Sequence, residues 1–180
     1  MKTKTMILCA VFAAILCVFS VMTIPIGIVP VSMGLFGIMI TAGILGLKRG
    51  TIAVAIFILI GAVGVPVFTG FRGGLSPLVG PTGGYIWGYV PMSALIGLLT
   101  LKMPKNKWYA MIKYFFSFLA GVVLCYAMGT AQFIIVQDVD FKAALGACVL
   151  PFIPFDIAKA AAASYISYAV RRALEKADIF

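Results

Sequence analysis

The sequence predicts an all-α integral membrane protein with six transmembrane helices, cytoplasmic N- and C-termini, and Gly/Pro-rich outer loops over a ligand pocket. Composition indicates the membrane: 63% of the 180 residues are hydrophobic and 11% are charged, with a mean hydropathy of +1.16. Soluble domains average roughly 25% charged residues, so this chain cannot cover a water-facing surface. At roughly 20 residues per spanning helix, the length accommodates about six spans. We therefore expect one transmembrane domain over residues 1–180.

Three apolar runs make up the first third of the chain. The first run is long for the apolar region of a signal peptide and no cleavage site follows it, so we expect a transmembrane helix. It ends where two prolines and a glycine interrupt the pattern at 23–30. The second run stops at the basic stretch 48–50, and the third begins directly afterwards and ends before Pro66. The predicted helices are about 6–22, 31–47 and 51–65.

The remaining helices are separated by distinctive loops. Segment 66–84 contains six glycines and three prolines and is therefore predicted to be irregular. The fourth helix ends at the basic loop 102–107, and the fifth is long enough to imply tilt. The sixth follows a polar link and is predicted to break at Pro151 and Pro154. The predicted helices are about 85–101, 110–136 and 143–172.

The charge distribution supports this topology. Eleven of the 14 basic residues lie near the termini or in the loops after the second and fourth helices, where the net charge is +9. The opposite side has a net charge of zero. Basic loops face the cytoplasm, so we expect an even number of spans across the cell (cytoplasmic) membrane. Because these short clusters are explained by topology and anionic lipid, we expect the lipid bilayer and no nucleic acid as a partner.

Several missing residues exclude classes of chemistry. The chain has no histidine and no G-x-x-x-x-G-K-[ST] phosphate loop, and its five acidic residues leave little scope for a paired-carboxylate active site. We therefore expect neither an enzyme nor a metal or cofactor site. The four cysteines lie in apolar segments without a C-x-x-C spacing, which is typical of small buried side chains.

The outer segment 64–84 is the first candidate for binding. Its glycines and prolines expose backbone N–H and C=O groups with little side-chain bulk, which suits the enclosure of a compact ligand. It leads into a predicted helix at Gly83-Gly84-Tyr85, whose N-terminal amides would favour an anion. The alternative is a flexible external loop whose glycines serve packing.

The second candidate is Asp156 with Lys159. Pro154 can begin a helical turn, which places the two charged residues on one helix face. Ionisable residues inside apolar segments are expensive and predict function. The alternative is a self-neutralising ion pair that orients the broken helix. Because a lysine near a helix N-terminus opposes the helix dipole, we favour a role for Lys159 toward a ligand carboxylate.

Ala10 and Ala14 form a weaker motif. Their spacing places two small residues on one face of the first helix, which permits close approach of another helix. Packing within the bundle is an equal alternative.

These residues together resemble the BioY family, the biotin-binding S components of energy-coupling-factor (ECF) transporters. The likeness is carried by Gly64-Val-Pro-Val-Phe-x-Gly, by Gly80-Pro-Thr-Gly-Gly-Tyr85 and by Pro-Phe-x-Pro-x-Asp156-x-x-Lys159. The chain departs from the family pattern at Ser32 and Gly34, where P-I-T-L-Q is usual, and at Phe155, where a glycine is usual.

The resemblance implies a vitamin-uptake protein that binds biotin and docks through its first helix on a coupling membrane subunit accompanied by two ATPases. For such a ligand, Asp156 can accept from the ureido N–H groups, Lys159 can pair with the carboxylate, and the loop 80–85 can supply amides and a tyrosine wall. The end of the vitamin that meets each of these residues stays open at this point. Two alternatives remain: an S component for another small vitamin, and a self-sufficient channel or secondary transporter, which the apolar second and third helices disfavour. The implied binding residues are Asp156, Lys159, Gly83, Gly84, Tyr85, Thr82 and Val79, and the implied docking residues are Ala10 and Ala14.

Overall fold

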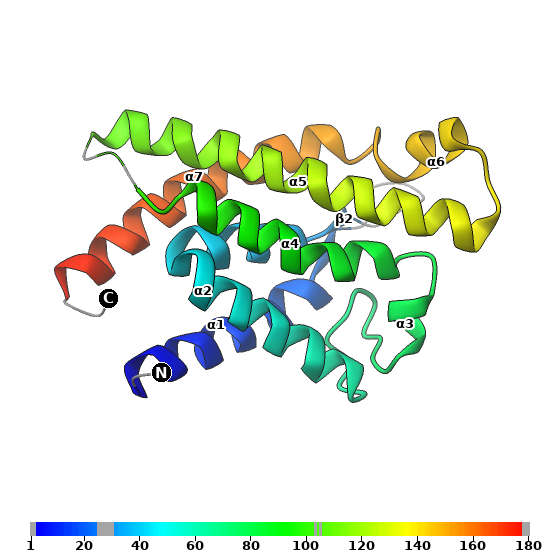
Figure 1. Cartoon of the computed structure of the whole chain (residues 1–180), viewed down its shortest axis with the longest axis horizontal. Helices are drawn as coiled ribbons and strands as arrows, with labels where there is room; N and C mark the ends of the chain where they lie inside the picture. The colour runs from blue at the N-terminus through cyan, green and yellow to red at the C-terminus, as the bar shows by residue number, and fades with distance from the viewer. Residues whose placement is uncertain (1–2, 25–30, 103, 105, 178–180) are drawn as a thin grey trace.

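The protein folds as a bundle of helices, described by a computed structural model over residues 3–24, 31–102, 104 and 106–177. The predicted break at 25–30 lies outside the described residues. Figure 1 shows the long helices lying side by side. The elements are α1 (Thr3–Val21), β1 (Thr23–Ile24), β2 (Val31–Ser32), α2 (Gly34–Ala62), α3 (Ser76–Val79), α4 (Gly83–Leu99), α5 (Lys107–Gln137), α6 (Phe141–Cys148) and α7 (Ile153–Lys176).

The lengths of these helices agree with a membrane protein. Within the described residues, α1, α2 and α5 are each long and apolar enough to cross a membrane, and α6 with α7 forms a fourth candidate span bent by 50°. α4 is also apolar but has 17 residues, which gives about 25 Å at 1.5 Å per residue. The predicted all-helical membrane class is confirmed.

The predicted second and third helices are the two arms of α2, and the chain reverses sharply between them. Gly46 has φ 72° and ψ −169°, a conformation that glycine adopts without steric cost. The two arms then pack against each other, since a Cβ on Gly50 would lie 3.1 Å from the Cα of Ala42. The predicted boundaries 31–47 and 51–65 were therefore wrong in detail, because the chain turns at Gly46 rather than at the basic residues after it.

Other boundaries also differ from the prediction. A short antiparallel pair, β1 with β2, precedes α2, and the segment predicted to be irregular contains α3. α5 begins at Lys107 rather than 110 because the Asn106 side chain accepts a hydrogen bond from the backbone of Trp108 and caps the helix. The predicted break in the helix 143–172 is confirmed, because α6 ends at Cys148, α7 begins at Ile153, and Pro154 lies in the first turn of α7.

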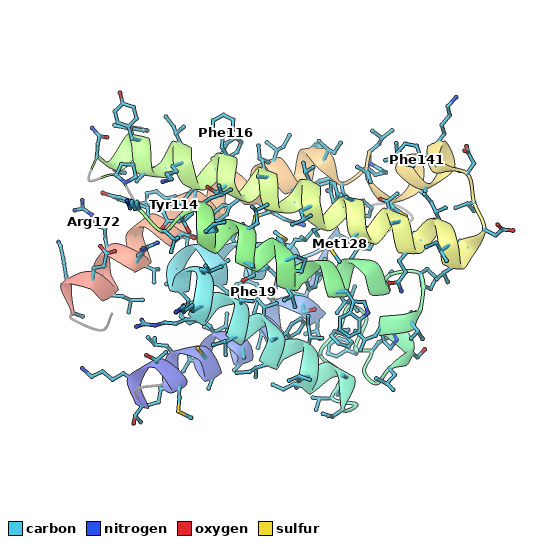
Figure 2. The ribbon with its side chains drawn as sticks, in the orientation of Figure 1. Phe19, Tyr114, Phe116, Met128, Phe141 and Arg172 are labelled. Carbon is cyan, nitrogen blue, oxygen red and sulfur yellow. The ribbon has the colours of Figure 1, made fainter. Side chains whose placement is uncertain are left out.

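The two sides of each helix differ in what they contact. Figure 2 shows Tyr114 directed into the bundle and Phe116 directed away from it, although both belong to α5. Tyr114 is 1% exposed and donates a hydrogen bond to the carbonyl of Gly43, whereas Phe116 is 64% exposed. Large apolar side chains on the outside are expected where lipid replaces water.

The chain returns repeatedly to the same two ends of the bundle. Figure 1 shows the start of α1 and the end of α7 at one end, together with the end of α4 and the start of α5. α3 and α6 lie at the opposite end, and β2 lies between that end and the middle of the bundle. The glycine-rich loops are therefore gathered at the end remote from the basic loops, and this end contains the candidate site.

Candidate ligand-binding site

A cavity of about 510 Å³ lies among the helix ends next to β2 and α3. Its volume falls in the range of roughly 300–1,000 Å³ that is usual for small-molecule sites. Apolar and aromatic side chains from five segments form much of the wall, and polar groups are concentrated on a few residues. The apolar and aromatic lining includes Leu35, Phe68, Ile86, Tyr89, Phe133 and Phe152. The polar lining includes Ser32, Thr69, Arg72, Thr82, Tyr85, Tyr126, Asp156 and Lys159.

Asp156 and Lys159 form the buried polar centre of this wall. Asp156 is 2% exposed and Lys159 is 8% exposed, and Lys159 Nζ lies 2.9 Å from Asp156 Oδ1. Asp156 occupies the first turn of α7, where a negative charge is favoured by the helix dipole. Lys159 is one turn further on, so the two side chains meet on one helix face, as their spacing predicted.

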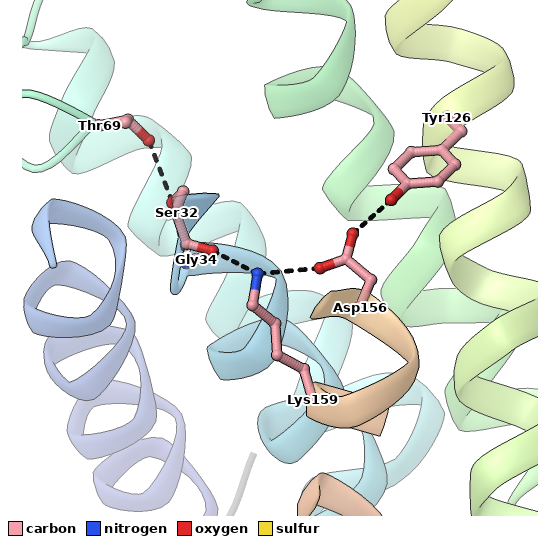
Figure 3. Close-up of polar contacts among 6 residues, drawn as sticks. All are labelled: Ser32, Gly34, Thr69, Tyr126, Asp156 and Lys159. Carbon is pink, nitrogen blue, oxygen red and sulfur yellow. Dashed lines mark hydrogen bonds and ion pairs between the residues drawn. The ribbon is translucent and has the colours of Figure 1, made fainter. Parts of the chain in front are cut away.

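Tyr126 fixes the other carboxylate oxygen. Its hydroxyl donates a short hydrogen bond to Asp156 Oδ2, from α5 to α7 (Figure 3). An apolar groove of about 730 Å³ between α5 and the α6–α7 pair is lined by both of these residues. The Tyr126–Asp156 contact therefore forms part of the wall between the cavity and this groove. A carboxylate held at both oxygens can present its remaining lone pairs in a defined direction.

Lys159 is also connected to the outer loop through Ser32. Lys159 Nζ donates to the carbonyl of Ser32 at 2.8 Å, and the Ser32 hydroxyl accepts from Thr69 at 3.2 Å. The backbone N–H of Gly34 donates to the same hydroxyl at 3.0 Å. Figure 3 shows this chain of contacts running from Thr69 through Ser32 to Lys159, Asp156 and Tyr126. One polar network thus connects the outer loop, β2, α5 and α7.

Tyr85 and Thr82 lie on the side of the cavity formed by α4. The Tyr85 hydroxyl lies 3.5 Å from Thr130 Oγ1 and donates to the carbonyl of Cys148 at 3.4 Å, which links α4 to α5 and α6. Thr82 lines the cavity at the residue before α4. The structure therefore brings four of the predicted binding residues to one cavity: Asp156, Lys159, Tyr85 and Thr82.

Three predicted binding residues lie elsewhere. Val79 is 71% exposed and does not line the cavity. Gly83 and Gly84 are buried in helix packing, because a Cβ on Gly83 would lie 1.9 Å from the Leu78 carbonyl oxygen and one on Gly84 would lie 2.5 Å from the Met128 carbonyl oxygen. Their small size is used where chain segments approach closely and neither lines the cavity, so the expectation that their amides meet the ligand stays a prediction.

Sequence reasoning missed most of the residues that complete the site. Ser32 was noticed only as a departure from a family pattern, and Thr69, Arg72 and Tyr126 were not singled out for binding. Each comes from a segment distant in sequence from Lys159. Their polarity inside or beside apolar runs was the one available indication, and it could not specify which of them meet.

The predicted docking residues lie on the outside of the bundle. Ala10 and Ala14 are exposed, whereas Phe12, Ala13 and Leu16 face the core. The face of α1 that carries the two alanines is thus not used for packing within the described part of the chain.

The fold and the site together define a class of protein: a helical membrane protein with a ligand cavity at one end of its bundle and an ion pair in the cavity wall. The profile of the BioY family matches residues 1–176. This chain belongs to the BioY family, so the expected family is confirmed.

Similar proteins cover nearly the whole chain. The biotin transporter BioY of Thermotoga maritima is 36% identical over 170 residues, which are 94% of this chain and 96% of that protein. The biotin transporter BioY of Rhizobium etli is 34% identical over 178 residues, with 94% of each chain covered. A crystal structure described as the S-component for biotin from an ECF-type ABC transporter superposes with a TM-score of 0.83 at 31% identity, covering 95% of this chain and 92% of that one. These relatives are transporters and not enzymes.

Proposed function

We propose that this chain binds biotin and is the substrate-binding S component of an ECF-type importer. The observation that carries this proposal is the buried Asp156–Lys159 pair in the wall of the cavity of about 510 Å³. The family and the similar crystal structure support the same ligand.

The chemistry of the cavity suits biotin. The vitamin has a polar ureido ring, an apolar thiophane body and a carboxylate tail. Asp156 can accept from ureido N–H groups, and Lys159 retains a third N–H donor beside its contacts with Asp156 and Ser32. Phe68, Tyr89 and Phe133 offer apolar surface for the thiophane body.

The proposed topology has six crossings of the cell (cytoplasmic) membrane with both termini in the cytoplasm. α1, the two arms of α2, α4, α5 and the bent α6–α7 pair supply the crossings. Support comes from the common end of the bundle reached by α1 and α7 (Figure 1) and from the basic residues Lys48 and Arg49 near the turn of α2. We treat residues 1–180 as one transmembrane domain.

The proposed partners are a coupling membrane subunit and two ATPase subunits. The chain contains no ATP-binding phosphate loop, so the energy for uphill uptake must come from other subunits. The exposed alanine face of α1 is the proposed docking surface.

The direct test is to identify the small molecule released when purified protein is denatured, by mass spectrometry, and then to titrate ligand-free protein with biotin calorimetrically. We expect biotin in the released fraction and saturable binding of one biotin per chain. Release of a different vitamin that competes with biotin would contradict the proposal. The control is a variant without the ion pair, Asp156→Asn combined with Lys159→Met. Any biotin that this variant still retains is bound at other sites or to detergent.

A further inference from the structure

Two cationic side chains line the cavity among the residues that the structure describes, Lys159 and Arg72. The charge of Lys159 is compensated by a neighbouring carboxylate, whereas among the described residues that of Arg72 is not. The two cations are therefore expected to contact different ends of an anionic ligand.

Lys159 makes two of its three possible hydrogen bonds with the protein. Its Nζ lies 2.9 Å from Asp156 Oδ1 and 2.8 Å from the carbonyl of Ser32, and the side chain is buried. The pair it forms has no net charge, so it offers a ligand carboxylate little net attraction. It instead presents an acceptor and a donor next to each other, which matches a neutral group that carries both N–H and C=O.

Arg72 has the opposite character. It is exposed at the cavity lining, and in the described part of the chain its guanidinium makes no hydrogen bond or ion pair. A guanidinium can hold a carboxylate through two parallel hydrogen bonds, and water hydrates it when no ligand is present. Arg72 is therefore the cavity cation with charge available for an anion.

The turn that carries Arg72 is anchored at both ends. The backbones of Phe68 and Arg72 exchange hydrogen bonds of 2.9 and 3.2 Å, and the chain between them reverses through Gly70 and Phe71, whose φ angles are 76° and 57°. The Phe68 ring packs edge-on against Phe57.

Thr69 in the same turn contacts Ser32, which contacts Lys159 (Figure 3). The turn is thus held over the cavity wall that carries the ion pair.

We propose that Arg72 binds the carboxylate of the ligand, whereas Asp156 and Lys159 bind its neutral polar head. This inference rests on the proposed function and assigns an orientation to the vitamin, with the ureido ring at the ion pair and the tail at the turn 68–72. It replaces the sequence-based expectation that Lys159 pairs with the carboxylate.

The test compares biotin with biotinamide, in which the carboxylate is replaced by a neutral carboxamide. Affinities for both are measured calorimetrically on the parent protein, Arg72→Gln and Arg72→Lys. Lys142→Gln is the matched control, because Lys142 is an exposed cation at the same end of the bundle that does not line the cavity. We expect the parent to prefer biotin by roughly tenfold or more, the size of a charge-assisted contact. Arg72→Gln should lose this preference and bind biotinamide like the parent, Arg72→Lys should keep part of it, and Lys142→Gln should match the parent.

Two results would overturn the assignment. If Arg72→Gln retains the parental preference for biotin, the carboxylate binds elsewhere. If Arg72→Gln weakens both ligands equally, Arg72 supports the turn rather than the ligand. A parent protein that binds neither compound would instead contradict the proposed function itself, and the inference with it.

Discussion

A carboxylate and an ammonium group are each costly to bury in an apolar bundle, and Asp156 and Lys159 reduce that cost by pairing. Tyr126 and Ser32 satisfy further hydrogen-bonding capacity on the two groups. An apolar pair of similar volume would be no less stable by the usual balance of desolvation against attraction. Retention of the charged pair at a cavity wall is therefore best explained by a ligand that needs both a donor and an acceptor.

We expect Asp156→Asn and Lys159→Ala each to weaken biotin binding by tenfold or more. Removing one charged partner leaves the other buried without compensation, which costs roughly 2–5 kcal/mol. Calorimetric titration of purified, folded variants measures the loss, and thermal unfolding of the same samples reports any effect on stability.

The double variant Asp156→Asn with Lys159→Met separates binding from stability. It removes both charges, so the bundle should unfold near the parental temperature while affinity stays low. Parental affinity in this variant would mean that the ion pair is only structural.

At the scale of the single helix, α1 presents small residues to the outside. Ala10 and Ala14 are one turn apart on the exposed face, and a bulky side chain there would hold a partner helix away. Ala10→Trp or Ala14→Trp should abolish association with the coupling subunit and leave biotin affinity near parental. Co-purification and ligand titration on the same variant measure the two properties.

The control for this substitution is Ile112→Trp, at a position on α5 that is 53% exposed and outside α1. It should retain the complex. Loss of biotin binding in Ala10→Trp with the complex retained would show that the alanine face supports the bundle instead.

The contact between α4 and α5 depends on the absence of a side chain at Gly84. A Cβ there would lie 2.5 Å from the Met128 carbonyl oxygen and 3.0 Å from the Cα of Gly129, so the two helices would have to separate. Gly84→Ala should lower stability by about 1–3 kcal/mol, the usual cost of overpacking. Thermal unfolding in detergent measures this change.

Gly146→Ala in α6 is the matched control, since an added Cβ at Gly146 meets nothing within 4 Å. It should be neutral or slightly stabilising because alanine is the better helix former. If Gly84→Ala keeps the parental stability but loses affinity for biotin, Gly84 contributes to the ligand site rather than to helix packing.

At the scale of the whole molecule, the proposed function assigns ligand binding to this chain and the driving of transport to its partner subunits. The sequence has no histidine and no phosphate loop, and the charged pair inside the bundle is already neutralised. Proteoliposomes that contain this chain without partners should therefore not accumulate biotin against a gradient, with or without ATP. Uptake of labelled biotin measures this, and net accumulation would favour secondary transport.

Much of the fold followed from local patterns. Apolar runs and basic loops predicted the helical membrane class, and Gly50 and the prolines of 151–154 lay near real reversals or breaks. The turn of α2 was placed a few residues too late in the sequence. Several glycines there could adopt the required backbone conformation, and the packing of the two arms against each other decides that Gly46 does so. The glycines and prolines of segment 66–84 predicted irregular structure, so neither α3 nor the start of α4 at Gly83 was predicted.

The sequence by itself determined the membrane class, the family resemblance and the placement of Asp156 and Lys159 on one helix face, because composition and a three-residue helical spacing are local properties. Only the tertiary structure decided that Gly83 and Gly84 pack against other segments rather than line the cavity, and that Ser32 lies beside Lys159, 127 residues away. The physical reason is that a polar or small residue has the same local chemistry whether it faces a ligand or a neighbouring helix. Which of these it faces depends on contacts between segments that are distant along the chain.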